Sequence, residues 1–257
     1  MALFIDGPPA SIEDLTDQDS GLLDICRTQQ IDASVKLRLA QAEIWVELES
    51  LFSQQRPVYP SYYYSQPQFS IRHLAITPPL KMWHTWHTLA LVYRDAYFNQ
   101  LNDRFQAKWN EYRILGNAAK DRLRDIGVGL VLDPIVRPNS PLLTPTPASE
   151  TGGAFYFAVV LQNEAGEQSA PSLVQSIQLA DGNAVDVTLT AVPANARGWL
   201  IYGGTSPDHL YLQNDVPIAL DGDWLFYPST AILTGQGPGT GQHPNLVRAV
   251  PRLLPRG

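Results

Sequence analysis

The sequence predicts an α+β protein of several domains: an N-terminal α-helical bundle with one long helix, a small antiparallel β-sandwich after it, and an extended C-terminal tail. Three observations support this order. From Leu80 to Ile126, apolar residues recur about every 3.6 positions, which is the period of an α-helix. Residues 149–228 contain short alternating apolar runs separated by turn residues. Residues 229–257 are rich in glycine and proline, as expected of a chain without regular structure of its own.

The composition supports folded domains and argues against several classes of protein. Of the 257 residues, 44% are apolar and only 17% are charged, which is enough apolar surface for real cores. The net charge of −7 argues against a surface built to bind DNA or RNA phosphates, because such surfaces need clustered lysine and arginine. No apolar run approaches the ~20 residues of a membrane-spanning helix, and the first residues lack the pattern of a signal peptide. The single cysteine, Cys26, excludes an internal disulfide and a cysteine-rich zinc site.

Residues 1–10 are expected to form an arm. Leu3, Phe4 and Ile5 are apolar, and the Gly-Pro-Pro sequence at 7–9 stops any helix. So short an arm can bury its apolar residues only against something already folded. It is therefore predicted to be a docking segment.

A helical domain is predicted over residues 11–136. Ser11 and Asp14 match a variant of the capping box, and a short helix is expected to follow and to end at Cys26. A second helix, with apolar residues at mixed three- and four-residue spacing, is expected to end before Arg56.

The loop predicted at residues 57–79 is rich in proline and aromatic residues, and Tyr62, Tyr63 and Tyr64 lie at its centre. It is too aromatic for a disordered linker, and tyrosine is enriched at protein interfaces. Two roles stay open: the loop contacts another subunit, or it packs back on its own helices.

The long helix from Leu80 to Ile126 would measure ~70 Å, more than twice the ~30 Å diameter of a small domain. A single compact fold could not cover its apolar face, so we expect contacts with other subunits there. Leu101, Phe105 and Trp109 lie on that face and are the predicted interface residues of the helix.

The composition changes after the helical domain. Residues 137–148 are predicted to be a proline-rich linker, residues 149–228 the β-sandwich, and residues 229–257 a docking tail. Six strands are expected at Phe155–Leu161, Leu173–Leu179, Val185–Val192, Trp199–Tyr202, Leu210–Leu212 and Trp224–Tyr227. In the tail, apolar and basic residues alternate and predict a strip that docks on an acidic surface. Its candidate interface residues are Leu246, Arg248, Arg252, Leu253 and Leu254.

No motif of catalysis is present. The sequence contains no Gly-x-Ser-x-Gly elbow, P-loop or dinucleotide fingerprint, so we expect no enzyme activity and no cofactor. His84 and His87 have a spacing that could place two imidazoles on one helical face, but a zinc site needs at least one more ligand. We therefore expect a solvated or hydrogen-bonded start of the helix, without metal. Acids of the long helix, such as Asp95 and Asp121, are interleaved with arginine and lysine and are expected to form a solvated face of mixed charge.

Residues 91–138 resemble the helical head-to-tail adaptor, or connector, proteins of tailed bacteriophages. In that family a long helix with Tyr-Arg-Asp-Ala and Leu-Asn-Asp-Arg-Tyr/Phe stretches is followed by a Gly-Val-Gly turn and an Asp/Asn-Pro segment. The matching residues are Tyr93, Arg94, Asp95, Ala96, Leu101, Asn102, Asp103, Arg104, Phe105, Gly127, Val128, Gly129, Asp133 and Pro134. The second half, with FYFAVVLQNEAGEQSAPS and GWLIYGGTS, is similar to the fibronectin-III/Ig-like modules of phage virion proteins.

The resemblance implies a structural protein of the virion neck, made in the host cytoplasm. It implies a ring, usually dodecameric, beneath the portal protein, with DNA passing through the channel without sequence-specific contact. A downstream neck or tail protein would attach to the ring. The alternatives are another tail or baseplate component, or a carbohydrate- or receptor-binding module in which aromatic residues of the β-sandwich stack on the ligand. The candidate stacking residues are Trp199, Tyr202, Tyr211 and Trp224, although we favour the interpretation that they fill the core of the sandwich.

Overall fold

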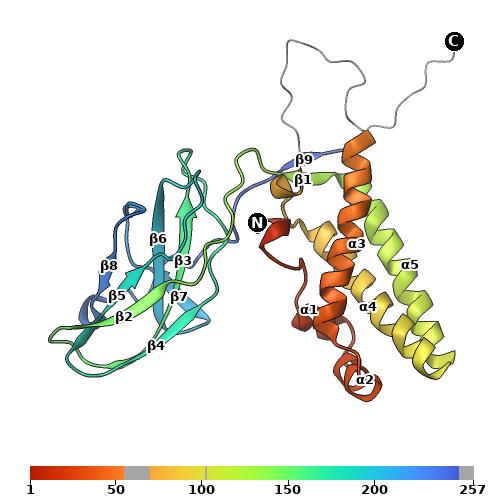
Figure 1. Cartoon of the computed structure of the whole chain (residues 1–257), viewed down its shortest axis with the longest axis horizontal. Coiled ribbons are helices and arrows are strands. Elements are labelled where there is room, and N and C mark those ends of the chain that lie inside the picture. The colour runs from red at the N-terminus through yellow and green to blue at the C-terminus, as the bar shows by residue number, and fades with distance from the viewer. Residues whose placement is uncertain (55–69, 102, 249–257) are drawn as a thin grey trace, which may run out of the picture. The chain divides into compact units, whose positions relative to one another are not determined.

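The computed structural model describes residues 1–54, 70–101 and 103–248 and shows a mixed α+β protein (Figure 1). The chain divides into two compact units. The helical unit contains residues 7–132 and the C-terminal residues from Pro244, and the β unit contains residues 1–6 and 133–243. The chain therefore passes between the units three times, and the expected arm at 1–10 is divided between them.

Three helices form the first part of the helical unit: α1 (Ile12–Gln18), α2 (Leu22–Gln29) and α3 (Ala33–Gln54). The predicted capping box is confirmed, because the Ser11 hydroxyl accepts from the Asp14 N–H at 3.2 Å and Asp14 accepts from the Ser11 N–H at 2.8 Å. The single short helix expected to end at Cys26 is instead two helices, because the chain turns at Asp19, whose carboxylate accepts the Gly21 N–H at 3.0 Å.

The prediction of one long helix is wrong. The segment forms two helices, α4 (Pro78–Gln100) and α5 (Asp103–Ile126), which lie side by side as a hairpin (Figure 1). The apolar period continues through both helices, so folding back places its two halves against each other. Phe105 and Tyr112 of α5 become fully buried in this way, with Tyr93 of α4 between them. The hairpin therefore buries within one chain much of the surface that a straight helix would leave in water.

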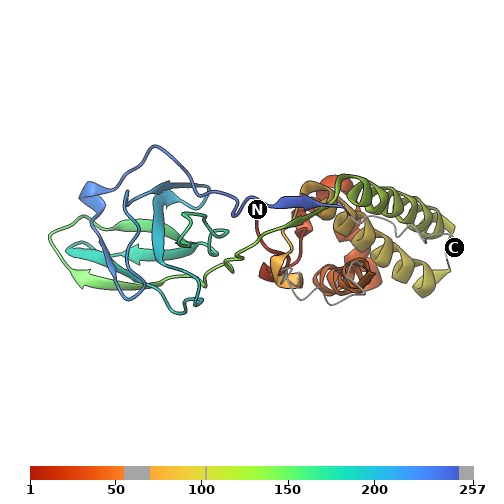
Figure 2. The same ribbon diagram turned by 90° about the horizontal axis from the view of Figure 1, so that it is seen from above.

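The C-terminal residues of the helical unit pair with a strand that follows α5. Strand β1 (Val128–Leu130) is antiparallel to β9 (Asn245–Val247), with Gly129 opposite Leu246, and the two strands lie beside each other in Figure 2. Gly129 leaves no room for a side chain, since a Cβ there would lie 2.6 Å from Thr77 Cγ2. Part of the predicted tail is thus a strand of this chain's own fold.

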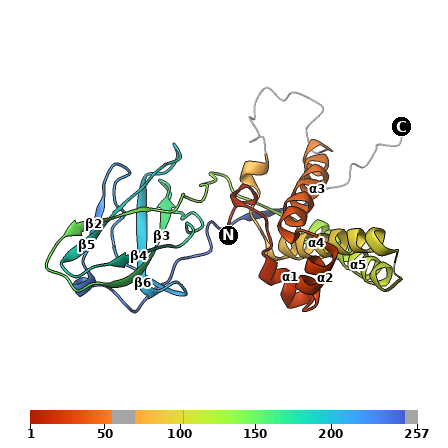
Figure 3. The same ribbon diagram turned by 60° about the horizontal axis from the view of Figure 1, so that its bottom comes forward.

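The β unit contains two antiparallel sheets with strand orders β2-β5-β8 and β4-β3-β6-β7. Figure 3 shows β2 beside β5, and β3 pairs with β4 on one side and with β6 on the other. The strands are β2 (Leu142–Pro147), β3 (Gly153–Gln162), β4 (Gln175–Leu179), β5 (Asn183–Thr188), β6 (Gly198–Ser206), β7 (His209–Leu212) and β8 (Trp224–Phe226).

All six strands expected from the alternating pattern overlap an observed strand. The predicted linker at 137–148 differs from the structure, because it contains β2, which pairs along its whole length with β5. Proline is compatible with a strand at the edge of a sheet, where an N–H need not donate to a neighbour. The sheet therefore begins before residue 149.

One apolar core lies between the two sheets. Phe157 of β3 meets Phe226 of β8 in a T-shaped contact with 4.9 Å between the ring centroids, and Trp199 and Val187 are fully buried in the same cluster. The Trp199 indole N–H donates to the Ala219 carbonyl at 3.0 Å, so its polar atom is satisfied within the core.

Residues 229–243, which were expected to belong to an extended tail, follow the edge of the β unit. The Leu212 N–H donates to the Gln236 carbonyl at 3.0 Å. Further along, the buried Gln242 side chain accepts from the Ile135 N–H at 2.7 Å and donates to the Asp133 carbonyl at 2.8 Å. The backbone of this segment is therefore held by contacts within the β unit.

Candidate functional site

The strongest candidate for a functional surface is the turn between α4 and α5. We call Tyr97, Phe98, Leu101 and Trp109 the hairpin tip. Trp109 is half-buried and stacks on Tyr97 with 6.1 Å between centroids, while Phe98 lies tilted against it at 5.9 Å. Phe98 and Leu101 remain 61% and 69% exposed, so the tip presents two large apolar side chains to solvent.

Leu101 has an unusual backbone conformation. Its φ is 51°, in the left-handed region, and its N–H donates to the Tyr97 carbonyl at 2.5 Å as it ends α4. Glycine or asparagine is the usual residue at such a helix end, because a Cβ is disfavoured there by ~1 kcal/mol or more. A large apolar residue in this position, with its side chain in solvent, has no evident role in the stability of the hairpin.

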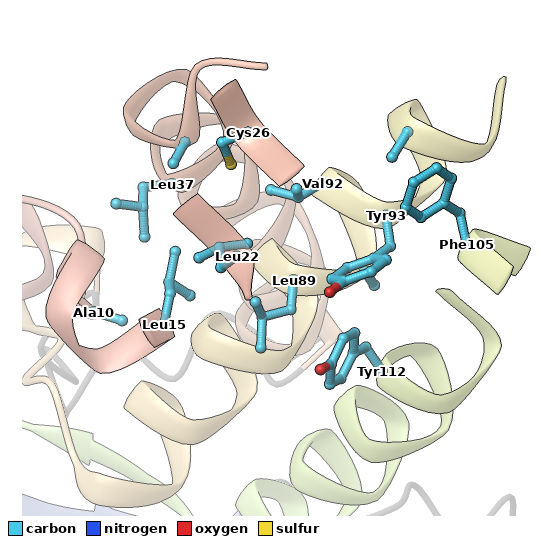
Figure 4. Packing of buried hydrophobic residues seen from close by; sticks show 13 residues of the cluster. Ala10, Leu15, Leu22, Cys26, Leu37, Leu89, Val92, Tyr93, Phe105 and Tyr112 are labelled. Atoms are coloured by element: carbon cyan, nitrogen blue, oxygen red, sulfur yellow. The ribbon is translucent and has the colours of Figure 1, made fainter. Parts of the chain in front are cut away.

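A hydrogen-bonded cluster fixes the hairpin to the turn between α1 and α2. The Asp19 carboxylate accepts from the hydroxyls of Tyr93 at 2.5 Å and Tyr112 at 2.7 Å. Figure 4 shows the two tyrosine rings side by side with their hydroxyl groups toward the same region. The cluster therefore joins α4 and α5 to the segment before α2.

The protonation state of the Asp19 carboxylate depends on two opposing effects. Burial raises the pKa of Asp19, but the hydrogen bonds from Tyr112, Tyr93 and the Gly21 N–H, with the nearby Lys108 ammonium, outweigh it and lower the pKa below its usual value. Burial and the Asp19 carboxylate raise the pKa values of both tyrosines. The acid is thus ionised and the phenols are neutral at pH 7, which suits a structural clamp. Asp19 was not found in the sequence because its partners lie 74 and 93 positions away.

The predicted interface residues of the long helix have different environments. Leu101 is exposed and Trp109 is half-buried, and both stay predicted interface residues. Phe105 is only 2% exposed and packs against Tyr93 inside the hairpin. Its prediction as an interface residue is wrong, because the hairpin brings its partner from the same chain.

The predicted docking strip lies only partly in the described residues. Leu246 is exposed on β9, and the Arg248 Nε donates to the Ile126 carbonyl at 3.4 Å within the helical unit. The remaining predicted interface residues lie outside the described residues: Arg252, Leu253, Leu254, Tyr62, Tyr63 and Tyr64.

The charged residues of the helices form ion pairs between helices and do not gather at one site. Asp95 of α4 pairs with Lys36 of α3, and Lys120 of α5 pairs with Glu47 of α3 at 2.6 Å. Asp121 lies 3.8 Å from Arg124 on the outside of α5. Asp121 thus lies on a solvated face of mixed charge, as predicted, whereas Asp95 and Lys120 instead hold α4 and α5 against α3.

His84 and His87 have separate environments. The His84 Nε2 is 2.9 Å from the Leu37 carbonyl in a fully buried position, whereas His87 Nε2 is 2.6 Å from Glu43 Oε2 near the surface. Burial lowers the pKa of His84 to about 4, so this imidazole is neutral at pH 7. Within the described residues, no three histidine, cysteine or acidic side chains lie close enough together to hold a metal ion.

An open groove of 670 Å³ lies in the helical unit, between residues 8–11 and α3. Its charged walls include Asp14 and Lys81, which pair with each other at 2.7 Å, and Arg38. The groove contains no histidine or cysteine, and we assign it no catalytic role.

The aromatic residues predicted to stack on a ligand are mostly core residues. Trp199 and Tyr202 are fully buried, and Tyr211 and Trp224 are half-buried. Trp199 and Tyr202 are therefore not accessible to stack on a carbohydrate, as the binding-module alternative requires.

Comparisons with known proteins identify no relative of this chain. None of the protein-family models, curated proteins and solved structures compared with the chain matches it. No helix in the described ranges is both long and apolar enough to span a bilayer.

Proposed function

We propose that this protein is a structural component of a phage neck, a head-to-tail adaptor whose subunits form a ring beneath the portal. The hairpin tip is the observation that carries the proposal. Phe98 and Leu101 are exposed to solvent at the end of α4, where the backbone of Leu101 is in the left-handed region. Both residues lie within the segment that resembles the adaptor family. A neighbouring subunit that covers these two side chains would remove their apolar surface from water.

The charge of the chain is compatible with a conduit for DNA. At a net charge of −7, the protein has little electrostatic attraction for phosphates, so DNA could pass through a channel without being held. The portal on one side and a neck or tail protein on the other are the proposed partners.

The strand order of the β unit supports a fibronectin-III/Ig-like module. The sheet order β4-β3-β6-β7 corresponds to the order C′-C-F-G of such modules, and β2 beside β5 corresponds to strands B and E. Strand β8 occupies the position of strand D, although it comes after all the other strands of the β unit. We propose that this sandwich decorates the ring, and that helices α1 to α5 form the bundle of the adaptor.

Substitution at the hairpin tip tests the ring. The double variant Phe98→Ser/Leu101→Ser changes only exposed side chains, so we expect it to fold and to remain monomeric. A matched control is Val46→Ser/Ile114→Ser, because both residues are 64% exposed on other helix surfaces. Native mass spectrometry should find rings for the wild type and the control only. If the tip variant assembles as well as the control, the tip is not the ring contact.

Binding to the portal protein tests the proposed position of this protein in the virion. A deletion from Gln242 would remove contacts within the β unit, so a cleaner deletion removes only residues 249–257, after β9. Co-purification with the portal protein of the same phage should succeed for the full chain and fail for this deletion. Rings that never bind portal would favour the tail or baseplate alternative.

A further inference from the structure

The four sheet edges of the β unit differ in how they are protected. An edge strand exposes unpaired N–H and C=O groups, and proteins usually block such an edge with proline, charge, short strands or a covering segment. Strand β2 carries Pro145 and Pro147, and β8 is only three residues long. Strand β7 is followed along its edge by the segment that contains Gln236. Three of the four edges therefore have a recognisable protection.

Strand β4 has no proline and no charge, and the one bond from another segment near its start is that of the Ser140 hydroxyl to the Leu173 carbonyl, at 3.1 Å, among the described residues. Its sequence is Gln-Ser-Ile-Gln-Leu, and its inner edge pairs with β3 in regular register. Among the described residues, no backbone group from another segment bonds to its outer edge between Val174 and Gln178. The chain just before it adds exposed apolar surface, since Leu173 is 68% exposed.

The charge around β4 indicates what kind of partner can approach. Residues 149–228 carry nine acidic residues against Arg197 alone, so two β units repel each other over most of their surfaces. Residues 168–180 contain no charged side chain. An identical strand can therefore meet β4 without like charges facing each other, whereas an acidic or basic peptide would find no opposite charge to pair with on the strand itself.

The strand is also complementary to itself. In an antiparallel pair, a two-fold axis at Ile177 places Ile177 opposite its copy and Ser176 opposite Gln178. Ile177 then meets its copy on the core face and Ser176 meets Gln178 on the outer face, while Gln175 lies opposite Leu179 at the two ends of the pair. Shifts of one or two residues keep the pair free of charge.

We propose that β4 is an interaction edge that pairs antiparallel with β4 of a second copy of this chain, joining two four-stranded sheets into one. Such a contact is isologous and links subunits in pairs, unlike the head-to-tail contacts that close a ring. It does not depend on the adaptor function. Within an assembly, the high local concentration of β units favours it.

Cysteine cross-linking of the full chain tests this contact. In a chain that carries Cys26→Ser, the substitutions Ser176→Cys and Gln178→Cys each add an exposed thiol on β4. Each variant is oxidised alone and in a mixture with the other, so that neighbouring registers of the strand pair are also detected. The control is Thr144→Cys, equally on the surface but on the proline-bearing edge strand β2. Under mild oxidation we expect disulfide-linked dimers to form at least ~10-fold faster from β4 than from the control. Equal or slower formation from β4 would overturn the proposal.

Charge on the edge provides a second measurement. Ser176→Lys/Gln178→Lys places like charges opposite each other, and Thr144→Lys/Thr190→Lys adds the same charge elsewhere. Each lysine pair is combined with Ile177→Cys, which supplies the thiol for the cross-link. The lysines on β4 should abolish the disulfide-linked dimer, and the control lysines should preserve it. A cross-link that survives the β4 lysines would contradict strand pairing. The same comparison in the Phe98→Ser/Leu101→Ser chain separates this proposal from the ring, since the β4 cross-link should persist there.

Discussion

Acid should destabilise the helical unit through His84. The Leu37 carbonyl can only accept, so His84 Nε2 carries the hydrogen and Nδ1 is unprotonated. Nδ1 is buried and has no hydrogen-bond partner among the described residues. Protonation would create a charged N–H at that atom without an acceptor. Burial is the main cause of the low pKa, and the neighbouring His87 lowers it further, while the Leu37 carbonyl and the more distant Asp14 act in the opposite direction.

The size of the effect follows from the two pKa values. In the unfolded chain His84 has its ordinary pKa of 6.5, and in the folded protein the pKa is about 4. As the pH falls below 6.5, the unfolded chain binds the proton first, so the free energy of unfolding decreases. The loss is complete near pH 4 and amounts to about 3 kcal/mol. Above pH 6.5 this contribution is fully present.

Urea unfolding followed by helical circular dichroism, repeated at several pH values, measures this loss. The variant His84→Gln keeps a neutral donor for the Leu37 carbonyl and cannot titrate. We expect its free energy of unfolding to fall less than that of the wild type between pH 7 and pH 4, by about 3 kcal/mol. Parallel curves for the two proteins would refute the explanation. The substitution His209→Gln, at an exposed position of the β unit, controls for general loss of an imidazole.

Three further predictions follow from the hairpin and its neighbours. Asp19→Ala leaves two phenol hydroxyls without their acceptor and should lower the free energy of unfolding by about 3 kcal/mol, with Asp19→Asn losing less, as measured by thermal unfolding. Phe105→Asp buries a charge and should lower the free energy of unfolding by at least about 4 kcal/mol, whereas Leu101→Asp should leave it nearly unchanged and prevent assembly. Urea unfolding measures the stability and native mass spectrometry the assembly. Equal losses of stability in the two variants would contradict the exposed position of Leu101. Gly129→Ala should displace β9, so that hydrogen exchange of residues 245–247 rises while that of α3 does not.

The sequence was sufficient to predict elements whose signal is local. The capping box of Ser11 and Asp14 and the six alternating runs of the β unit depend on residues within a few positions, and the structure confirms them. Strand β2 was missed because its prolines suggested a linker, although an edge strand tolerates them.

The turn at Leu101 could not be predicted by the same reasoning. The apolar period continues without interruption through the turn, so periodicity alone cannot distinguish one long helix from two that pack on each other. The distinction depends on whether the apolar face finds its partner in the same chain. Contacts such as Asp19 with Tyr112, or β1 with β9, likewise join residues far apart in sequence and have no local signature.

The mass of the purified full-length protein at micromolar concentration tests the central claim most directly. If the chain is an assembly protein whose hairpin tip is covered by a neighbour, native mass spectrometry should find a closed ring, a whole-number multiple of the 28.5 kDa chain, and the Phe98→Ser/Leu101→Ser variant should not form it. A wild-type protein that remains a monomer with or without its portal protein would contradict the account.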